Sequence, residues 1–297
     1  MVPVDRASAM TSASNKPLLL LGADGMLGRA FVEAFQKQNR SFEALTLPQF
    51  DLTRPESIRN AIFPRFAAVI NCAGYTDVDG AETNHALANQ INAFGVGQLA
   101  VDCNLASIPL VHFSTDYVFD GSSHDPYPPT PPPANSRPIN VYGQSKLRGE
   151  ELIREMSDDH LIIRTSWVYA PWAKNFVRTI ASASRSKPEL KVVNDQRGRP
   201  TSAEHLAQAT LALLARKSRG TYHITDGGEC TWFDFAAEIV RLISAPCKVT
   251  PCTSAEFPRP AKRPAYSVLE ITKTEQELGP MPSWQANLAQ VITRIES

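Results

Sequence analysis

The sequence predicts an α/β fold, in which a doubly wound parallel sheet is joined to a smaller C-terminal domain. Short, continuously apolar runs alternate with amphipathic stretches along the chain, a pattern typical of strands buried between two layers of helices. A glycine-rich turn at 22–28 separates the first apolar run from the first amphipathic stretch. The length of 297 residues exceeds the usual size of one domain, which favours one large core or two domains.

The N-terminal half alternates strands and helices. The unit at 17–38 begins with an apolar run, passes through the glycine turn and continues as a helix with Leu27, Phe31 and Phe35 on one face. Pro55 suits the first turn of the next helix. The further elements expected here are a strand at 41–47, a helix at 55–63, a strand at 67–74, a helix at 84–106 and a strand at 107–119.

The C-terminal half is less regular but continues the alternation. Helix propensity favours a helix at 143–156, and Thr231 is a suitable N-cap for a later one. Strands are expected at 161–169, 190–195 and 220–226, helices at 175–185, 202–216 and 231–243, and a short helix at the C-terminus.

Composition narrows the classes of function. Thirty Lys and Arg balance thirty Asp and Glu, and no run of five like charges occurs, which argues against a nucleic-acid or membrane-surface binder. Residues 1–16 are small and polar, lack the apolar core of a signal peptide and are expected to form a disordered tail. Five scattered cysteines without a CxxC pair fit a reducing cytoplasm. A small-molecule partner is therefore expected.

Gly22, Gly25 and Gly28 form a GxxGxxG turn between strand and helix. Glycine there allows a tight turn, a close approach of the backbone to a pyrophosphate and close packing of the helix, whose N-terminus attracts phosphate. Many glycine-rich turns only turn the chain, but at the first unit of an α/β protein this one predicts a Rossmann-type dinucleotide site. Residues 46–48 offer neither an acid for a ribose hydroxyl nor an arginine for a 2′-phosphate, so both NADH and NADPH remain candidates.

Tyr142 and Lys146 lie four residues apart at the start of a predicted helix and share one of its faces. A nearby ammonium favours the phenolate and is expected to lower the tyrosine pKa towards neutrality. This spacing alone also occurs on solvated helices. Thr115 ends an earlier apolar strand, where α/β sheets bind their ligands. A hydroxyl, a phenol and an amine beside a nicotinamide suit carbonyl reduction, with Tyr142 as the proton donor.

Eight segments carry a resemblance to a known family. They are GADGMLG, INCAGYTDVDGAE, HFSTDYVFDG, INVYGQSK, RTSWVYA, VVNDQRGRPTSAEHLA, GTYHITDGG and AKRPAYSVL. Together they resemble the dTDP-4-dehydrorhamnose reductases, which are extended short-chain dehydrogenases/reductases, from about Leu18 to the C-terminal PSWQANLAQVI. The resemblance implies NADPH- or NADH-dependent reduction of the C4 carbonyl of dTDP-4-dehydro-L-rhamnose to dTDP-L-rhamnose.

The resemblance also implies residue roles by position. Thr115, Tyr142 and Lys146 match the catalytic residues. The cofactor positions are Gly22, Gly25, Met26, Leu27, Gly28, Asp51, Leu52, Cys72, Ala73, Gly74, Tyr142 and Lys146. The substrate positions are Asp116, Tyr117, Trp167, Asn194, Gln196 and Arg263. Residues 17–170 are then the dinucleotide-binding domain, to which a strand near 220–226 returns, and 171–297 are mainly an interleaved substrate-binding domain.

Departures from the family pattern leave alternatives open. Tyr266 stands at a usual Asn and Arg197 at a usual aromatic residue, which suggests a reductase of another nucleotide-linked 4-keto-6-deoxyhexose. The neutral segment PPTPPPANSR replaces an acidic pair and puts in doubt any Mg²⁺ ion or homodimer contact made by those acids. A third hypothesis is a non-catalytic regulatory subunit resembling the methionine adenosyltransferase β subunit, which the complete Thr, Tyr and Lys set disfavours.

Seven prolines lie between Pro126 and Pro138. Alone, they predict a stiff linker. Because Thr115 before them and Tyr142 after them must meet at one carbonyl oxygen, we instead expect the segment to leave the sheet edge and return to it. The prediction is an active-site loop at 125–138 whose prolines reduce the entropy lost on ordering.

Overall fold

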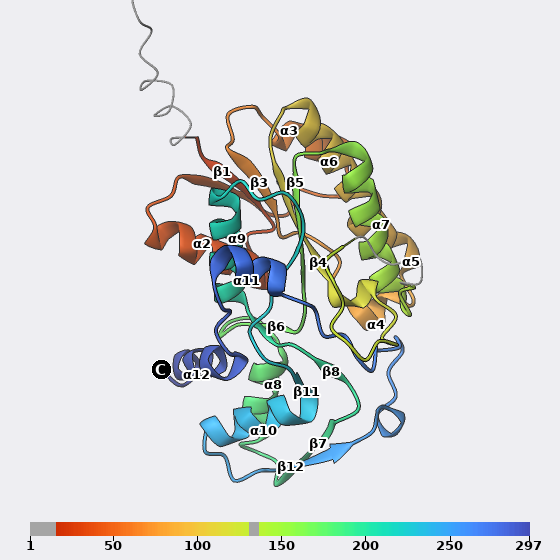
Figure 1. Ribbon diagram of the computed structural model, residues 1–297, viewed down its shortest axis with the longest axis vertical. Coiled ribbons are helices and arrows are strands. Elements are labelled where there is room, and N and C mark those ends of the chain that lie inside the picture. The colour runs from red at the N-terminus through yellow and green to blue at the C-terminus, as the bar shows by residue number, and fades with distance from the viewer. Residues whose placement is uncertain (1–15, 131–136) are drawn as a thin grey trace, which may run out of the picture.

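The computed structural model describes residues 16–130 and 137–297 (Figure 1). The tail predicted at 1–16 lies, apart from Lys16, outside the described residues, and so does the centre of the predicted proline loop. No helix in the described ranges is both long and apolar enough to span a membrane.

A six-stranded sheet with the order β10-β5-β4-β3-β1-β2 forms the centre of the larger part of the molecule. All neighbouring strands in it are parallel, which confirms the predicted α/β class. The strand order reverses between β1 and β3, the place where open parallel sheets bind ligands. The strands are β1 (Leu18–Leu21), β2 (Phe42–Leu45), β3 (Ala68–Asn71), β4 (Leu110–Thr115), β5 (His160–Thr165) and β10 (Gly220–His223).

Helices cover both faces of this sheet because its central strands are apolar on both sides. Leu18 and Leu20 of β1 belong to a core shared with α2 (Met26–Lys37) and α9 (Ala203–Ala215). The intervening residues, Leu19 and Leu21, belong to a second core, on the opposite face. That core is shared with α3 (Pro55–Ala61), α6 (Val96–Leu105) and α7 (Val141–Met156), which lie together on one side of the sheet in Figure 1.

The helix predicted at 84–106 is divided in the structure. It begins as α5 (His85–Asn89), passes through a π-helical segment (Gln90–Gly95) and continues as α6. Within the π-helical segment, the Asn92 amide accepts a hydrogen bond from Tyr75 N (2.8 Å) and donates one to Tyr75 O (3.0 Å). The wider turn therefore places a polar side chain against the loop that follows β3.

The predicted strand at 161–169 is also interrupted. β5 ends at Thr165, and β6 (Val168–Tyr169) pairs with β9 (Thr201–Ser202) in a separate two-stranded sheet. Between them, Trp167 has a φ of 49°, in the left-handed region that strands do not use. The strand predicted at 107–119 likewise ends at Thr115 and is followed by a 3₁₀ turn (Asp116–Val118).

A smaller group of elements lies at the end of the molecule opposite α3 and α6, in the lower part of Figure 1. The parallel pair of β7 (Glu189–Val193) and β12 (Lys248–Cys252) and the helices α8 (Phe176–Ala183), α10 (Trp232–Leu242) and α12 (Trp284–Glu296) surround a core of their own. Thr231 caps α10, as predicted, and Asp234 completes a capping box. The remaining elements are α4 (Val78–Ala81), β8 (Arg197–Gly198), β11 (Cys230–Thr231), α11 (Thr272–Leu278) and two 3₁₀ turns, of which the second spans Ser254–Glu256.

Several elements, among them β12 and α11, have no counterpart in the sequence prediction. β12 contains Pro251 and only five residues, and α11 is a seven-residue helix, so neither has a long periodic pattern. The division of the chain into domains at residue 170 stays a prediction.

Candidate active site

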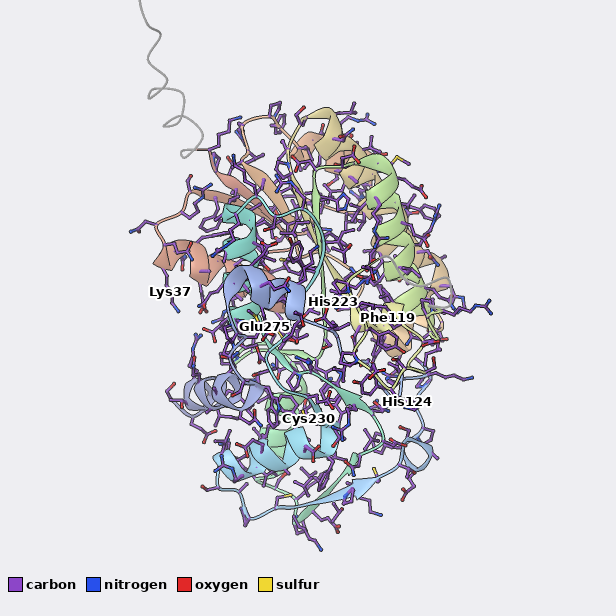
Figure 2. The ribbon with its side chains drawn as sticks, viewed as in Figure 1. Lys37, Phe119, His124, His223, Cys230 and Glu275 are labelled. Atoms are coloured by element: carbon purple, nitrogen blue, oxygen red, sulfur yellow. The ribbon has the colours of Figure 1, made fainter. Side chains whose placement is uncertain are left out.

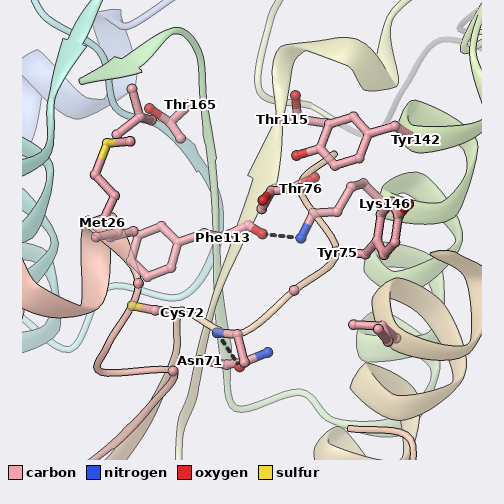
Figure 3. Close-up of a pocket in the computed structure, with 18 of the residues that line it drawn as sticks. Met26, Asn71, Cys72, Tyr75, Thr76, Phe113, Thr115, Tyr142, Lys146 and Thr165 are labelled. Carbon is pink, nitrogen blue, oxygen red and sulfur yellow. Dashed lines mark hydrogen bonds between the residues drawn. The ribbon is translucent and has the colours of Figure 1, made fainter. Parts of the chain in front are cut away.

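A cavity of about 710 Å³ lies at the carboxyl ends of β1, β3 and β4 (Figure 3). Its wall begins at the glycine turn, continues past the loop after β2 and ends beside α7. The cofactor and catalytic residues expected from the sequence that line it are Gly22, Gly25, Met26, Leu27, Asp51, Leu52, Cys72, Ala73, Gly74, Thr115, Tyr142 and Lys146.

The glycine turn is too crowded for side chains at two of its positions. Gly22 has a φ of 75°, and a Cβ there would lie 2.7 Å from Ala73 N. Gly28 does not line the cavity, but a Cβ on it would lie 2.1 Å from Gly22 O. Gly25, the N-cap of α2, has no capping side chain, and the first two helical residues, Met26 and Leu27, line the cavity. This cradle fits the pyrophosphate of a dinucleotide.

Replacement of Gly28 by Ala is expected to weaken cofactor binding at least about tenfold and to lower the free energy of unfolding by about 1–3 kcal/mol. The added Cβ would meet backbone atoms of Gly22 and Ala23, which cannot move without distorting the cradle. The measurement is titration with NADPH, followed by protein fluorescence, together with urea unfolding. Gly97→Ala is the matched control, because the three atoms nearest to its Cβ all belong to the Leu152 side chain, the first at 3.1 Å. Equal NADPH affinity in the two variants would contradict the expectation.

The loops after β2 and β3 form the middle of the cavity wall. Asp51 accepts hydrogen bonds from the Thr53 hydroxyl (2.7 Å) and amide (2.9 Å), and the first of these is the main reason that its pKa is lowered. Asn71 Oδ1 accepts a hydrogen bond from Ala73 N (3.1 Å) and holds the second loop against the end of β3. Both loops are thus ordered by their own polar side chains.

Thr115, Tyr142 and Lys146 converge on one end of the cavity (Figure 3). Tyr142 stands in the first turn of α7, which Asn140 caps by accepting a hydrogen bond from Gly143 N (2.7 Å). A Cβ on Gly143 would lie 2.1 Å from Tyr117 O, so glycine lets the helix approach the 3₁₀ turn that follows Thr115. This close approach brings the phenol beside the threonine hydroxyl.

The electrostatic prediction for the tyrosine was wrong for this state of the protein. Tyr142 faces the recessed cavity rather than open solvent, and this burial raises its pKa above the ordinary value; the negative charge of Asp116 adds to the rise, and the Thr115 hydroxyl offsets part of it. Lys146 Nζ instead donates to Phe113 O (2.5 Å) and lies 3.1 Å from His112 Nε2. The phenol is therefore held in its protonated, proton-donating form.

Lys146 itself is buried and surrounded by polar groups. Burial lowers its pKa to about 8, and the charge of Glu150 offsets part of this effect. His112 is one of these polar groups, and its other ring nitrogen lies 3.1 Å from Asn71 Nδ2. Small environmental changes can thus alter the charge of this amine near neutral pH.

A buried ion pair anchors the helix that carries Tyr142 and Lys146. Arg164 of β5 and Glu150 of α7 are both fully buried and form two hydrogen bonds of 2.9 and 2.7 Å, and Arg154 also contacts Glu150. Although burial raises the pKa of Glu150, the arginines outweigh it and lower that pKa to about 2. Arg164 also stacks over Phe119, which packs edge-on against His223 (Figure 2).

Three of the predicted substrate residues line the cavity, namely Asp116, Tyr117 and Trp167. Trp167 stacks on Trp232 with ring centroids 3.6 Å apart, and Phe176 packs against Trp232 at 4.5 Å. Trp232 and Phe176 also line the cavity but were missed by the sequence analysis. The sequence did offer one signal for Trp232, namely that it is an aromatic residue directly after the predicted Thr231 cap.

The other three predicted substrate residues lie outside the cavity wall. Asn194 Oδ1 accepts a hydrogen bond from the Thr231 hydroxyl (2.7 Å), and Gln196 Nε2 donates one to Ser254 Oγ (2.8 Å). Arg263 is paired with Asp79 through contacts of 2.5 and 3.1 Å. Their contact with a substrate stays a prediction. Among the described residues, no group of three or more His, Cys, Asp or Glu side chains is arranged to hold a metal ion.

Comparison with known proteins places this geometry in a family. The family model described as the RmlD substrate binding domain matches residues 16–297. The chain belongs to this RmlD family. A protein of Streptomyces niveus named dTDP-4-keto-6-deoxy-D-glucose reductase is 37% identical over 92% of this chain and 95% of the relative.

Other similar proteins carry a different reductase name, dTDP-4-dehydrorhamnose reductase. A dTDP-4-dehydrorhamnose reductase of Mycobacterium tuberculosis is 38% identical over 92% of this chain and 91% of the relative. The crystal structure of a dTDP-4-dehydrorhamnose reductase from Bacillus anthracis in complex with NADP matches with a TM-score of 0.88 and 33% identity, over 95% of this chain and all of that one. The resemblance expected from the sequence is thus confirmed.

Proposed function

We propose that the protein reduces the C4 carbonyl of a dTDP-linked 4-keto-6-deoxy-L-hexose with NADPH or NADH, and that dTDP-4-dehydro-L-rhamnose is its substrate. The observation that carries the proposal is the convergence of Thr115, Tyr142 and Lys146 on a cavity that begins at a glycine cradle. Membership of the RmlD family and the reductase names of its relatives support it.

The proposed chemistry divides the work between the cofactor and the chain. Bound NADPH or NADH supplies the hydride that adds to C4. The Tyr142 phenol, whose pKa is raised by burial, donates its proton to the carbonyl oxygen, and the Thr115 hydroxyl donates a hydrogen bond to the same oxygen. Lys146, one helical turn from Tyr142, is proposed to hold the cofactor ribose.

A coupled assay with enzymatically made dTDP-4-dehydro-L-rhamnose tests substrate and cofactor together. Oxidation of NADPH and of NADH is followed in separate reactions, and the product sugar is identified by NMR. The proposal expects dTDP-L-rhamnose and cofactor oxidation in equal amounts. Absence of turnover with both cofactors, from protein that binds NADPH, would overturn the proposed substrate.

A second candidate is a reductase of the dTDP-4-keto-6-deoxy-D-glucose type. It is favoured by the Streptomyces niveus relative of that name and by two unusual residues, Arg197 and Tyr266, which form an isolated β-bridge with each other. Comparison of kcat/KM across several dTDP-4-keto sugars separates the candidates. We expect the rhamnose precursor to have the highest value.

The remaining expectations are proposals about binding. Trp167 and Trp232 offer an aromatic surface for the nucleotide or the sugar, and Lys174 is a cation on the same wall. Arg263 is a candidate for the diphosphate, which would require it to leave Asp79. A homodimer and a Mg²⁺ ion at its contact are retained only as proposals.

A further inference from the structure

Asp116 is a buried acid with one unsatisfied oxygen at the reacting end of the cavity. It is 3% exposed, and its Oδ1 accepts a hydrogen bond from Thr115 Oγ1 at 3.0 Å. Its Oδ2 has no hydrogen-bond partner in the described part of the chain. The Ser267 hydroxyl lies near enough to favour the charged form but does not satisfy hydrogen-bond geometry. A buried carboxylate in this setting is costly.

The Thr115 hydroxyl has one proton to donate and two lone pairs to accept with. In the structure the proton goes to Asp116 Oδ1, and one lone pair accepts from Tyr117 N at 3.2 Å. A hydroxyl that donates to a carboxylate makes a strong, charge-assisted bond. While Asp116 is ionised, Thr115 therefore has no proton for a substrate carbonyl oxygen.

Protonation of Asp116 reverses this arrangement. The acid then donates to the second lone pair of Thr115 Oγ1, and the Thr115 proton is free to point into the cavity. Every hydrogen-bonding group of Thr115 is then satisfied, and the carbonyl oxygen accepts from both Thr115 and Tyr142. Loss of the negative charge also removes its unfavourable effect on a phenol that must become a phenolate.

We propose that Asp116 is a positioning residue that acts in its protonated form, by donating to Thr115 and so directing the Thr115 hydroxyl at the substrate carbonyl. This inference rests on the proposed function and adds a required protonation state to it. No covalent step is added: the hydride still comes from the cofactor and the proton from Tyr142.

The surroundings of Asp116 are compatible with this role near neutral pH. Burial raises its pKa to about 7, and the nearby hydroxyls of Ser267 and Thr115, which favour the charged form, offset part of this rise. The titratable groups that face it are Tyr117 on its own turn and Tyr142 on α7. Among the described residues no cation forms a salt bridge with Asp116: Arg263 contacts Asp79, and Lys146 contacts Phe113 O.

The test is the pH dependence of a ratio, kcat/KM of the wild type over kcat/KM of Asp116→Asn. The Asn side chain can still donate to Thr115, more weakly, and cannot ionise. We expect the ratio to be about 10 near about pH 6 and to fall below about 1 near about pH 9, because only the wild type loses its donor while the Asn variant keeps its weaker one. Ionisation of Lys146 affects both proteins, and Tyr142, whose pKa is raised chiefly by burial, stays protonated over this pH range. A ratio that is constant or rises with pH would overturn the proposal.

Two further variants sharpen the test. Asp120→Asn is the control. Although burial alone would raise the Asp120 pKa, hydrogen bonds from Ser122 and Tyr127 outweigh it and lower that pKa. The ratio of kcat/KM between the wild type and Asp120→Asn should therefore not change over this pH range. The ratio of kcat/KM for the wild type over kcat/KM for Thr115→Val should fall with the same midpoint, because Thr115 contributes nothing once Asp116 ionises. A ratio for Thr115→Val that does not change with pH would contradict the assignment.

A spectroscopic measurement needs no substrate and separates failure of this inference from failure of the proposed function. The infrared difference spectrum between about pH 5.5 and about pH 9, wild type minus Asp116→Asn, should contain the carbonyl band of a protonated carboxylic acid that disappears with a midpoint near neutrality. Absence of that band would overturn the inference whatever the enzyme reduces. Its presence, without turnover of any dTDP-4-keto sugar, would leave the acid assigned and overturn only the proposed reaction.

Discussion

Replacement of Tyr142 by Phe is expected to lower kcat about 10²–10⁴-fold with the keto sugar as substrate, and to change KM little. The phenol is protonated at neutral pH, because burial raises its pKa. Thr115 can donate a hydrogen bond but is too weak an acid to give up its proton. The ring remains in the Phe variant, so packing in the first turn of α7 is retained. Initial rates of NADPH oxidation measure the effect.

Tyr127→Phe is the matched control for this prediction. Tyr127 is buried, but its hydroxyl donates to Asp120 (2.8 Å), and its ring stacks on Phe119 away from the cavity wall. Its loss should leave kcat within about twofold, since no group that touches the reacting atoms is removed. If Tyr142→Phe retained kcat as well as Tyr127→Phe does, the proton would have to come from another group.

Replacement of Glu150 by Gln is expected to lower the free energy of unfolding by about 3–5 kcal/mol. The amide cannot balance the charge of Arg164, which has no exposed surface and would be left as an uncompensated cation in the core. Gln keeps the size of the side chain, so the effect is not that of a cavity. Urea unfolding followed by fluorescence and circular dichroism measures it.

Glu151→Gln on the same helix is the control. Glu151 is exposed and pairs with Arg148 at the surface, where ion pairs contribute about 0–1 kcal/mol. Replacing both members of the buried pair, Glu150→Leu with Arg164→Met, should recover much of the lost stability, because no charge is then left buried. Equal losses for Glu150→Gln and Glu151→Gln would show that the pair is not needed.

The sheet and most helices were predictable because their patterns are local. Four consecutive leucines in β1 and the apolar run of β4 are buried throughout, as continuous apolar strands of a parallel sheet should be. The break at Trp167 was not predictable, because it is accompanied by stacking on Trp232, a residue 65 positions away in the sequence. The π-helical segment was missed for a similar reason, since Asn92 is held by Tyr75 from another loop.

The candidate site was predictable where spacing expresses the chemistry. GxxGxxG and the Tyr142 and Lys146 pair have a fixed separation on one turn or helix. The pKa of Tyr142 was not predictable from the sequence. Burial and the charge of Asp116 come from the folded chain and outweigh the effect expected of Lys146. Asn194 is a third case: its hydrogen bond with Thr231 gives no sequence signal, so its place outside the cavity wall was hidden.

The most direct test of the central claim is transfer of deuterium from the cofactor to the sugar. Nicotinamide cofactor that carries deuterium at the transferred position is incubated with the protein and dTDP-4-dehydro-L-rhamnose, and the product is analysed by NMR. The account expects dTDP-L-rhamnose with one deuterium on C4, and strongly reduced incorporation with Tyr142→Phe. Cofactor oxidation without deuterium at C4, or an unchanged keto sugar after prolonged incubation with cofactor-bound protein, would contradict it.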